Sequence, residues 1–292
     1  MDEIHRPVLL NEALDYLSVQ PGGLYVDATF GFGGHAEAIL KAGGKVLGLD
    51  ADEESLRLGG KRLAAEFNDL KDNLKLIRGN FREIETLARE NGFGSVNGVL
   101  FDLGFSSWQL EHSGRGFSFL RDEPLDMRMD NRLMVTAADL VNGLGKQELY
   151  ELFTRFGEET RARRLAEFII ESRRIEPILK ASDLAERISQ VAGRKFKHRH
   201  PATKVFQALR IAVNDELNCL RVALPQALKL LRPGGRLVVI SFHSLEDRLV
   251  KNYFRSVAAS LILTKKPVIP SDSEMRENPR ARSAKLRALE LL

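Results

Sequence analysis

The chain has 292 residues, of which 43% are hydrophobic and 29% charged, as in a folded globular protein with enough apolar surface for a core. Its one cysteine, Cys219, excludes a disulfide framework and a Cys-rich metal site, and the histidines lack the spacing of a zinc motif, so we expect no metal. The net charge of +4 is uneven, because residues 155–210 hold fourteen Lys and Arg against seven Asp and Glu.

The N-terminus lacks the charged and then apolar pattern of a signal peptide. No apolar run approaches the roughly 20 residues that span a bilayer. We therefore expect a cytoplasmic protein with no membrane partner.

The first hundred residues alternate short apolar runs with amphipathic stretches, a pattern typical of βαβ units with a parallel sheet. Helices are predicted around 8–17, 34–42 and 52–67, and strands at 24–28, 45–50, 74–78 and 96–102.

This alternation of apolar runs and amphipathic stretches then ends. Residues 106–131 are polar and without a clear period, residues 136–190 are helical, and a long helical stretch is predicted from about 203 to 231. A strand follows at 235–241, and residues 261–264 and 284–291 are candidates for a closing antiparallel pair. We predict an α/β domain of residues 1–114 and 208–292, interrupted by a helical insertion at 115–207.

A glycine-rich turn separates the first strand from the next helix, in the string Asp27-Ala-Thr-Phe-Gly31-Phe-Gly33-Gly34-His35. Glycines there let a nucleotide cofactor approach the backbone. Asp50 ends the second strand, nineteen residues after Gly31, where a carboxylate can accept hydrogen bonds from ribose hydroxyls. A tight packing turn without a ligand remains the alternative.

Three features favour S-adenosylmethionine over a nicotinamide dinucleotide. Asp27 precedes the glycines, Asp102 closes the fourth strand, and Leu231-Arg-Pro-Gly-Gly-Arg-Leu-Val-Val-Ile240 resembles the helix, turn and strand of many Rossmann-like methyltransferases. Phe81, directly after the third strand, is placed either to cover an adenine face or to pack in the core.

The chain closely resembles the RsmH (MraW) family of ribosomal small-subunit RNA cytosine-N4 methyltransferases. The match runs nearly end to end through several long and unusual strings. They are His5 to Leu10, Asp27 to His35, Phe101 to Gly104, Ser106-Ser107, Arg115 to Phe119, Pro124 to Asp130, Phe196 to His198, Pro201 to Thr203, Phe206 to Ala208, Ile240 to Arg248 and Asn278 to Ser283.

The resemblance implies a Rossmann-like class I S-adenosylmethionine methyltransferase fold with an inserted helical domain. It also implies an activity, methylation of the N4 amine of a cytidine in the decoding region of 16S rRNA, within the small ribosomal subunit and with no obligatory protein partner. In this family the cofactor is held by the residues matching Gly33, Gly34, His35, Asp50, Phe81, Asp102 and Gln109. His35 and Gln109 come from the resemblance alone. Phe105 and Trp108 depart from the family's usual aliphatic residue and proline, which puts the shape of the target pocket in doubt.

Transfer to an exocyclic amine needs a hydrogen-bond acceptor that takes the amine proton. We assign Asp102 this catalytic role as a hypothesis, beside its cofactor contact. A cytidine in folded RNA must be turned out of its stack, and a flipped base commonly lies against an aromatic ring. Phe105 and Trp108 are the candidates, and packing of the loop against the core is the alternative for Trp108.

The string Arg194-Lys195-Phe196-Lys197-His198-Arg199-His200, with Lys204 beyond it, combines cations with an aromatic residue and is our predicted RNA-binding cluster. A solvated charged face is the alternative. A nicotinamide dehydrogenase, a non-catalytic RNA-binding module or assembly factor, and a methyltransferase acting on DNA or protein also remain as competing functions. The roles of His243 and Glu246 stay open between function and stabilisation of a strand-to-helix corner.

Overall fold

The computed structural model describes residues 7–67, 70–192 and 200–292. The chain forms two compact units, one of Met1–Gly104 with Leu217–Leu292 and one of Phe105–Glu216. The boundaries predicted after residues 114 and 207 lie inside the second unit. No helix among the described residues is both long enough and apolar enough to cross a membrane.

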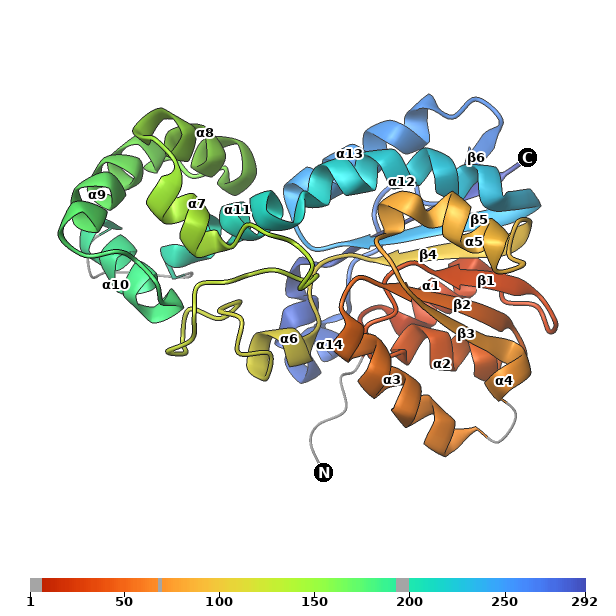
Figure 1. Ribbon diagram of the computed structural model, residues 1–292. Coiled ribbons are helices and arrows are strands. Elements are labelled where there is room, and N and C mark those ends of the chain that lie inside the picture. Colours follow the sequence, from red (N-terminus) through yellow and green to blue (C-terminus); the bar gives the residue numbers. More distant parts are fainter. Residues whose placement is uncertain (1–6, 68–69, 193–199) are drawn as a thin grey trace. The chain divides into compact units, whose positions relative to one another are not determined.

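The first unit is built on one sheet, in which the described residues contribute seven strands in the order β3-β2-β1-β4-β5-β7-β6 (Figure 1). The strands are β1 Leu24–Asp27, β2 Lys45–Asp50, β3 Leu74–Arg78, β4 Val96–Asp102, β5 Leu231–Ser241, β6 Ser260–Ile262 and β7 Lys285–Leu291. Strands β1 to β5 pair in parallel, and β7 pairs antiparallel with β5 and β6. This order is that of class I methyltransferases, so the predicted Rossmann-like fold and its closing antiparallel pair are confirmed.

Helices cover both faces of the sheet (Figure 1). The helices of this unit are α1 Leu10–Leu17, α2 Gly34–Lys41, α3 Glu53–Glu66, α4 Leu70–Asn73, α5 Ile84–Glu90, α12 Glu216–Leu230, α13 Ser244–Ser256 and α14 Asp272–Glu277, with 3-10 helices η1 Phe81–Glu83 and η2 Pro279–Ser283. Side chains alternate along each strand, so Val99 and Phe101 share a core with α5, α12 and α13, whereas Leu100 belongs to the core of α1, α2 and α3.

The second unit is helical and has its own core. Its helices are α6 Ser107–Glu111, α7 Ala137–Gly143, α8 Lys146–Gly157, α9 Ala162–Ile175, α10 Ala181–Ala192 and α11 Ala202–Asn214. The helical prediction for 136–190 is confirmed. Residues 106–131, which we expected to lack regular structure, contain the short helix α6 because Ser106 and Gln109 form a capping box.

The helical stretch predicted over 203–231 is confirmed, but it consists of two helices that meet at Asp215. This residue has a positive φ of 49° and ends α11, its backbone N–H donating to the carbonyl of Ile211. Aspartate tolerates this left-handed conformation better than most residues, so the break is inexpensive. Strand β5 also begins at Leu231, earlier than predicted, and an irregular pairing with β4 takes up the Pro-Gly-Gly string.

Candidate active site

The glycine-rich turn connects β1 to α2 at the carboxyl edge of the sheet. Gly33 caps α2 with a φ of 77°, and a Cβ there would come within 2.7 Å of the Phe30 ring. Gly31 also has a positive φ, of 53°, but a Cβ on it would meet only the carbonyl oxygen of Thr29, at 3.9 Å. Glycine is therefore needed at both positions for conformation, and Gly31 borders open space that a ligand can enter.

Asp50 ties this turn to the end of β2. Its Oδ2 accepts a hydrogen bond from the Gly31 N–H at 2.7 Å, and its Oδ1 accepts one from the Asp52 N–H at 2.8 Å. A carboxylate offers about four lone-pair sites, and these two bonds orient the group at the end of β2. The position and charge suit the binding of paired hydroxyls.

Asp27 ends β1 and is 1% exposed. Its Oδ1 accepts from the Thr29 N–H at 3.2 Å. Burial, and to a lesser degree the negative charge of Asp50, raises the pKa of Asp27 to about 7. Near neutral pH this carboxyl is therefore only partly ionised.

Asp102 ends β4 beside the turn. Its N–H donates to the Thr29 hydroxyl at 2.6 Å, and its Oδ2 lies 3.5 Å from Nδ1 of the buried His35. Its Oδ1 is buried and accepts no hydrogen bond from any residue that the structure describes. Burial first, and then repulsion from Asp27 and Glu246, raises the pKa of Asp102 well above its usual value.

These carboxyls give the carboxyl edge of the sheet an excess of buried acid. Asp27, Asp50 and Asp102 converge there from three adjacent strands. Buried groups whose pKa values are raised together by desolvation and by one another are typical of functional sites. A cationic ligand would relieve their repulsion, whereas a second anion would add to it.

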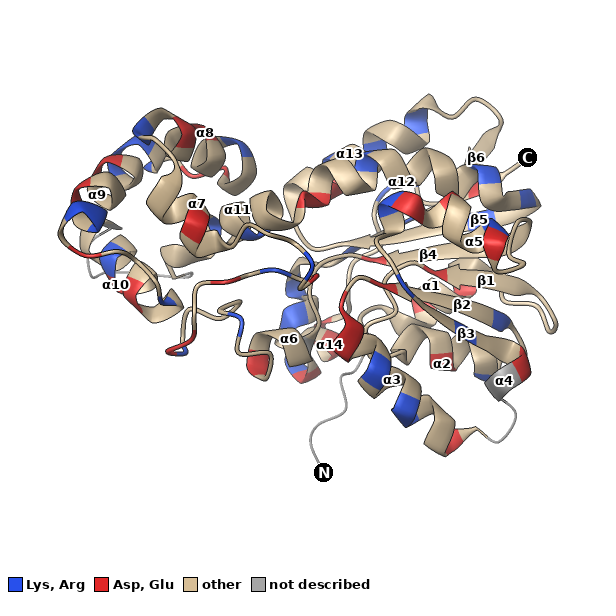
Figure 2. Ribbon diagram, viewed as in Figure 1, with Lys and Arg blue, Asp and Glu red and all other residues tan. Residues whose placement is uncertain are grey.

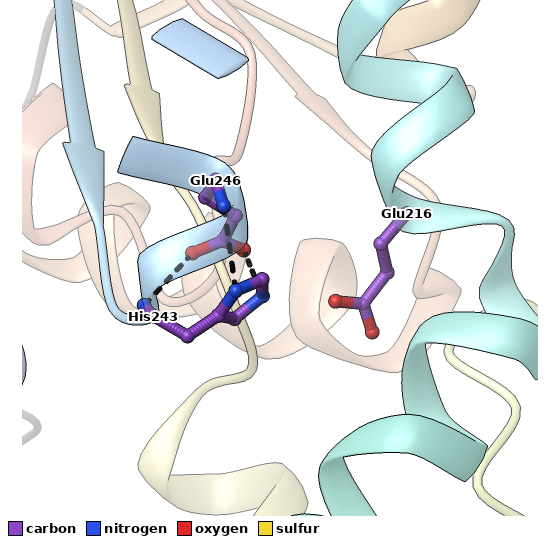
Figure 3. Close-up of side chains that lie close together, drawn as sticks. All are labelled: Glu216, His243 and Glu246. Atoms are coloured by element: carbon purple, nitrogen blue, oxygen red, sulfur yellow. Dashed lines mark hydrogen bonds and ion pairs between the residues drawn. The ribbon is translucent and has the colours of Figure 1, made fainter. Parts of the chain in front are cut away.

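His243 and Glu246 form the corner between β5 and α13 (Figure 3). Glu246 Oε2 accepts from the Phe242 N–H at 2.9 Å, and His243 Nδ1 accepts from the Glu246 N–H at 3.4 Å. The pair is thus a capping box at the start of α13. Glu246 is only 3% exposed and also acts electrostatically on Asp102, a link that the sequence did not reveal.

Phe81 follows β3 on the same edge and begins η1. Its ring meets Phe101 edge-to-face, with the centroids 5.6 Å apart, and remains half-buried. The Gly79 N–H donates to the Asp50 carbonyl at 2.9 Å, which fixes this loop to the end of β2. One part of the ring is therefore core, and its place at the edge is compatible with the predicted adenine contact.

Gln109, Phe105 and Trp108 lie in the second unit. The Gln109 Oε1 accepts from the Ser106 N–H at 2.9 Å as part of the capping box of α6. Phe105 is 36% exposed, and its ring lies between Phe117, at 5.8 Å, and the Arg210 guanidinium, at 4.8 Å. Trp108 is half-buried and stacks on His112 at 6.4 Å.

Most of the predicted RNA-binding cluster, Arg194, Lys195, Lys197, His198 and Arg199, lies outside the described residues. The structure describes the other two members. His200 stacks on Phe119 with the ring centroids 4.5 Å apart, and burial lowers its pKa. Lys204 Nζ donates to the Glu158 carbonyl at the end of α8, at 2.6 Å. Both side chains therefore contribute to the second unit's own fold.

Two strings of the family pattern hold one loop of the second unit together. Arg115 Nη1 donates to the carbonyls of Arg128 and Met129, each at 3.0 Å, and Arg128 forms an ion pair with Asp126 at 2.7 Å. The Asn214 side chain accepts from the Met129 N–H at 2.7 Å and donates to a second carbonyl of the same loop. The charged side chains of this loop are thus paired with one another and with backbone carbonyls.

The model of the MraW methylase family matches residues 2–292. The chain belongs to this family. Three curated relatives, all named "Ribosomal RNA small subunit methyltransferase H", cover almost the whole chain. The Carboxydothermus hydrogenoformans protein is 46% identical over 100% of this chain and 99% of its own length, the Thermomicrobium roseum protein 48% over 98% and 93%, and the Geobacter sulfurreducens protein 48% over 99% and 99%. A solved rRNA methylase from Streptococcus thermophilus covers 99% of both chains with a TM-score of 0.48 and 14% identity. As a member of the MraW family, the protein is an S-adenosylmethionine-dependent methyltransferase.

Proposed function

We propose that this protein transfers a methyl group from S-adenosylmethionine to the N4 amine of a cytidine in the decoding region of 16S rRNA, in the cytoplasm and within the small ribosomal subunit. The observation that carries the proposal is Asp102, a half-buried carboxyl with a raised pKa, whose buried Oδ1 has no hydrogen bond among the described residues. It stands beside the glycine-rich turn in a member of the MraW methylase family.

The residues at this edge fit the proposed cofactor. The open space beside Gly31 admits a ligand next to the backbone, and Asp50 is oriented to accept from ribose hydroxyls. The buried acids suit the positively charged methionyl end. The residues that we propose as cofactor contacts are Gly33, Gly34, His35, Asp50, Phe81, Asp102 and Gln109.

The sulfonium of the cofactor supplies a methyl group that is already activated for attack. The protein must then align the acceptor and receive a proton. A raised pKa makes the ionised Asp102 a better base than an ordinary aspartate, and His35 Nδ1, at 3.5 Å from Oδ2, orients the group. We assign Oδ1 as the atom that accepts the hydrogen bond of the amine and then its proton.

We propose that the insertion at 115–207 recognises the RNA. Phe105 is exposed enough to offer one ring edge to a flipped base, and Trp108 remains a second candidate. The side chains proposed to contact the RNA beside these rings are those of Arg194, Lys195, Lys197, His198, Arg199, His200 and Lys204. Lys204 retains further donors on its ammonium beyond the bond to Glu158.

The test is methyl transfer from labelled S-adenosylmethionine to undermethylated small subunits, free 16S RNA, DNA and bulk protein, followed by nucleoside analysis. We expect N4-methylated cytidine from the small subunit. Label only in DNA, in protein or in another nucleoside would overturn the proposed target. Tight binding of a nicotinamide dinucleotide but not of S-adenosylhomocysteine would overturn the proposed cofactor.

A further inference from the structure

The string Asn278-Pro-Arg-Ala-Arg-Ser283 is not explained by the proposed cofactor site. It forms η2, next to α14, in the first unit. Ala281 and Ala284 are buried in the same core as Val8 and Leu9, whereas Arg282 between them is exposed. The alanines therefore anchor the segment, and burial accounts for them but not for the arginine.

Arg276 and Arg282 form one exposed surface, here called the α14–η2 surface. Both line a single hollow together with Asp272, Met275 and Pro279. Figure 2 shows basic positions gathered on the ribbon around α14. Within the described part of the chain, no ion pair holds either guanidinium. Two arginines held on short helical segments, rather than on a long loop, suit an anion that accepts several hydrogen bonds.

A chain of contacts joins this surface to the glycine-rich turn. Glu274 in α14 accepts a hydrogen bond from the Leu9 N–H at 2.8 Å, so α14 holds the start of α1. Immediately before it, Pro7 lies so close to the turn that a Cβ on Gly34 would be 2.4 Å from its Cγ. These contacts connect α14, through the start of α1, to the first turn of α2, where the cofactor is proposed to bind.

We propose that the α14–η2 surface binds phosphate groups of the RNA that presents the methyl acceptor. The inference rests on the proposed function, because only an RNA substrate would bring a polyanion to this edge. Arginine binds phosphate through two parallel N–H donors, and the two side chains lie on the unit that carries the glycine-rich turn. This surface adds a second set of RNA contacts to those proposed for the insertion.

The test compares Arg276→Ala plus Arg282→Ala with a matched control, Lys45→Ala plus Arg232→Ala. The control also removes two exposed cations from the first unit, but at the starts of β2 and β5, at the opposite edge of the sheet. The measurement is the binding of undermethylated small subunits and of naked 16S RNA over a range of salt concentrations, with S-adenosylhomocysteine affinity and melting temperature as parallel readouts.

We expect the Arg276/Arg282 variant to bind both RNAs on the order of tenfold more weakly at low salt, with a salt dependence that is shallower by roughly 1.5 in the log–log slope. Cofactor affinity and melting temperature should stay at the levels of the unmodified protein. An unchanged slope, or one that changes equally in the control, would overturn the inference. Loss of binding to assembled subunits but not to naked RNA would also overturn it, by pointing to a protein partner. If the unmodified protein methylates no RNA, the proposed function fails instead.

Discussion

The carboxyl edge of the sheet and the loop of residues 115–132 are both rich in charged side chains, but the two regions differ in how these side chains are paired. In the loop, Asp126 and Asp130 each pair with an arginine two residues on, and Arg115 is fixed by backbone carbonyls. At the sheet edge, burial raises the pKa values of Asp27 and Asp102, and the negative charges of neighbouring acids raise them further. Charged side chains that pair with one another, as in the loop, indicate a structural role. Carboxyl groups that repel one another at the sheet edge indicate a site that binds a ligand.

The largest expected effect is at Asp102, and it tests the catalytic half of this comparison. Asp102→Asn keeps the shape but lacks a proton acceptor, so we expect kcat at saturating cofactor to fall about 10²–10⁴-fold. Single-turnover methyl transfer is the measurement. Asp15→Asn, the same change at an exposed position of α1, is the control. Full turnover by Asp102→Asn would show that this carboxyl is not the proton acceptor.

The next effect concerns a charged pair with a structural role, that of Arg210 and Glu216. Arg210 is 8% exposed and binds Glu216 through two hydrogen bonds of 2.8 and 2.9 Å while it covers the Phe105 ring. Because removing one member of a buried pair strands the other, we expect Arg210→Met to lower the free energy of unfolding by about 3 kcal/mol. Chemical denaturation measures this. The exposed Arg221→Met serves as control, and equal losses in the two variants would remove the distinction drawn here.

Removal of the charge of Asp27, unlike removal of the charge of Arg210, should stabilise the folded protein. Its folded pKa of about 7 lies above the unfolded value, so the folded state holds the extra proton and stability falls as pH rises from about 4 to 7. Asp27→Asn does not titrate, and without ligand at pH 8 it should be more stable by roughly 3–4 kcal/mol. The gap should close near pH 4. A variant that is less stable than the original protein at pH 8 would contradict the buried-acid interpretation.

The smallest effect concerns cofactor affinity. A cationic ligand favours ionised Asp27 and Asp102, whose pKa values are raised, and so releases protons on binding. We expect affinity for S-adenosylmethionine to rise about tenfold between pH 6 and 8, as for release of one proton over part of this range. Calorimetry in buffers of different ionisation enthalpy measures the release. S-adenosylhomocysteine lacks the sulfonium charge and should show a weaker dependence, and identical pH profiles would argue against the cationic contact.

The sequence was sufficient for the sheet, because its strands are short apolar runs whose period and bounding turns are local properties. It also placed Asp27, Asp50 and Asp102 at one edge, since parallel strands end together. The break at Asp215 was missed because the helical period continues through it, and only the backbone reverses. Glu246 was flagged without a role, and the Ser106 and Gln109 spacing was a readable capping signal that we did not use.

The predicted aromatic and basic contacts show the limit of such reasoning. Whether a phenylalanine or histidine packs inward depends on neighbours distant in the chain, and His200 meets Phe119 across some eighty residues. The sequence marked both as notable but gave no sign that they stack. A charged residue in a sequence likewise does not reveal which group it binds. Lys204, for example, donates to the carbonyl of Glu158.

Arg210 has a consequence for how the chain folds. The pairing of β4 with β5 closes a loop that contains residues 105–216, and closing so long a loop costs conformational entropy. Arg210 contacts Phe105 at one end of that stretch and Glu216 at the other. Folding of the helical unit therefore joins its own two ends and shortens the search that remains for the sheet. One buried guanidinium thus helps a chain whose sheet-forming unit is interrupted in sequence by the helical unit.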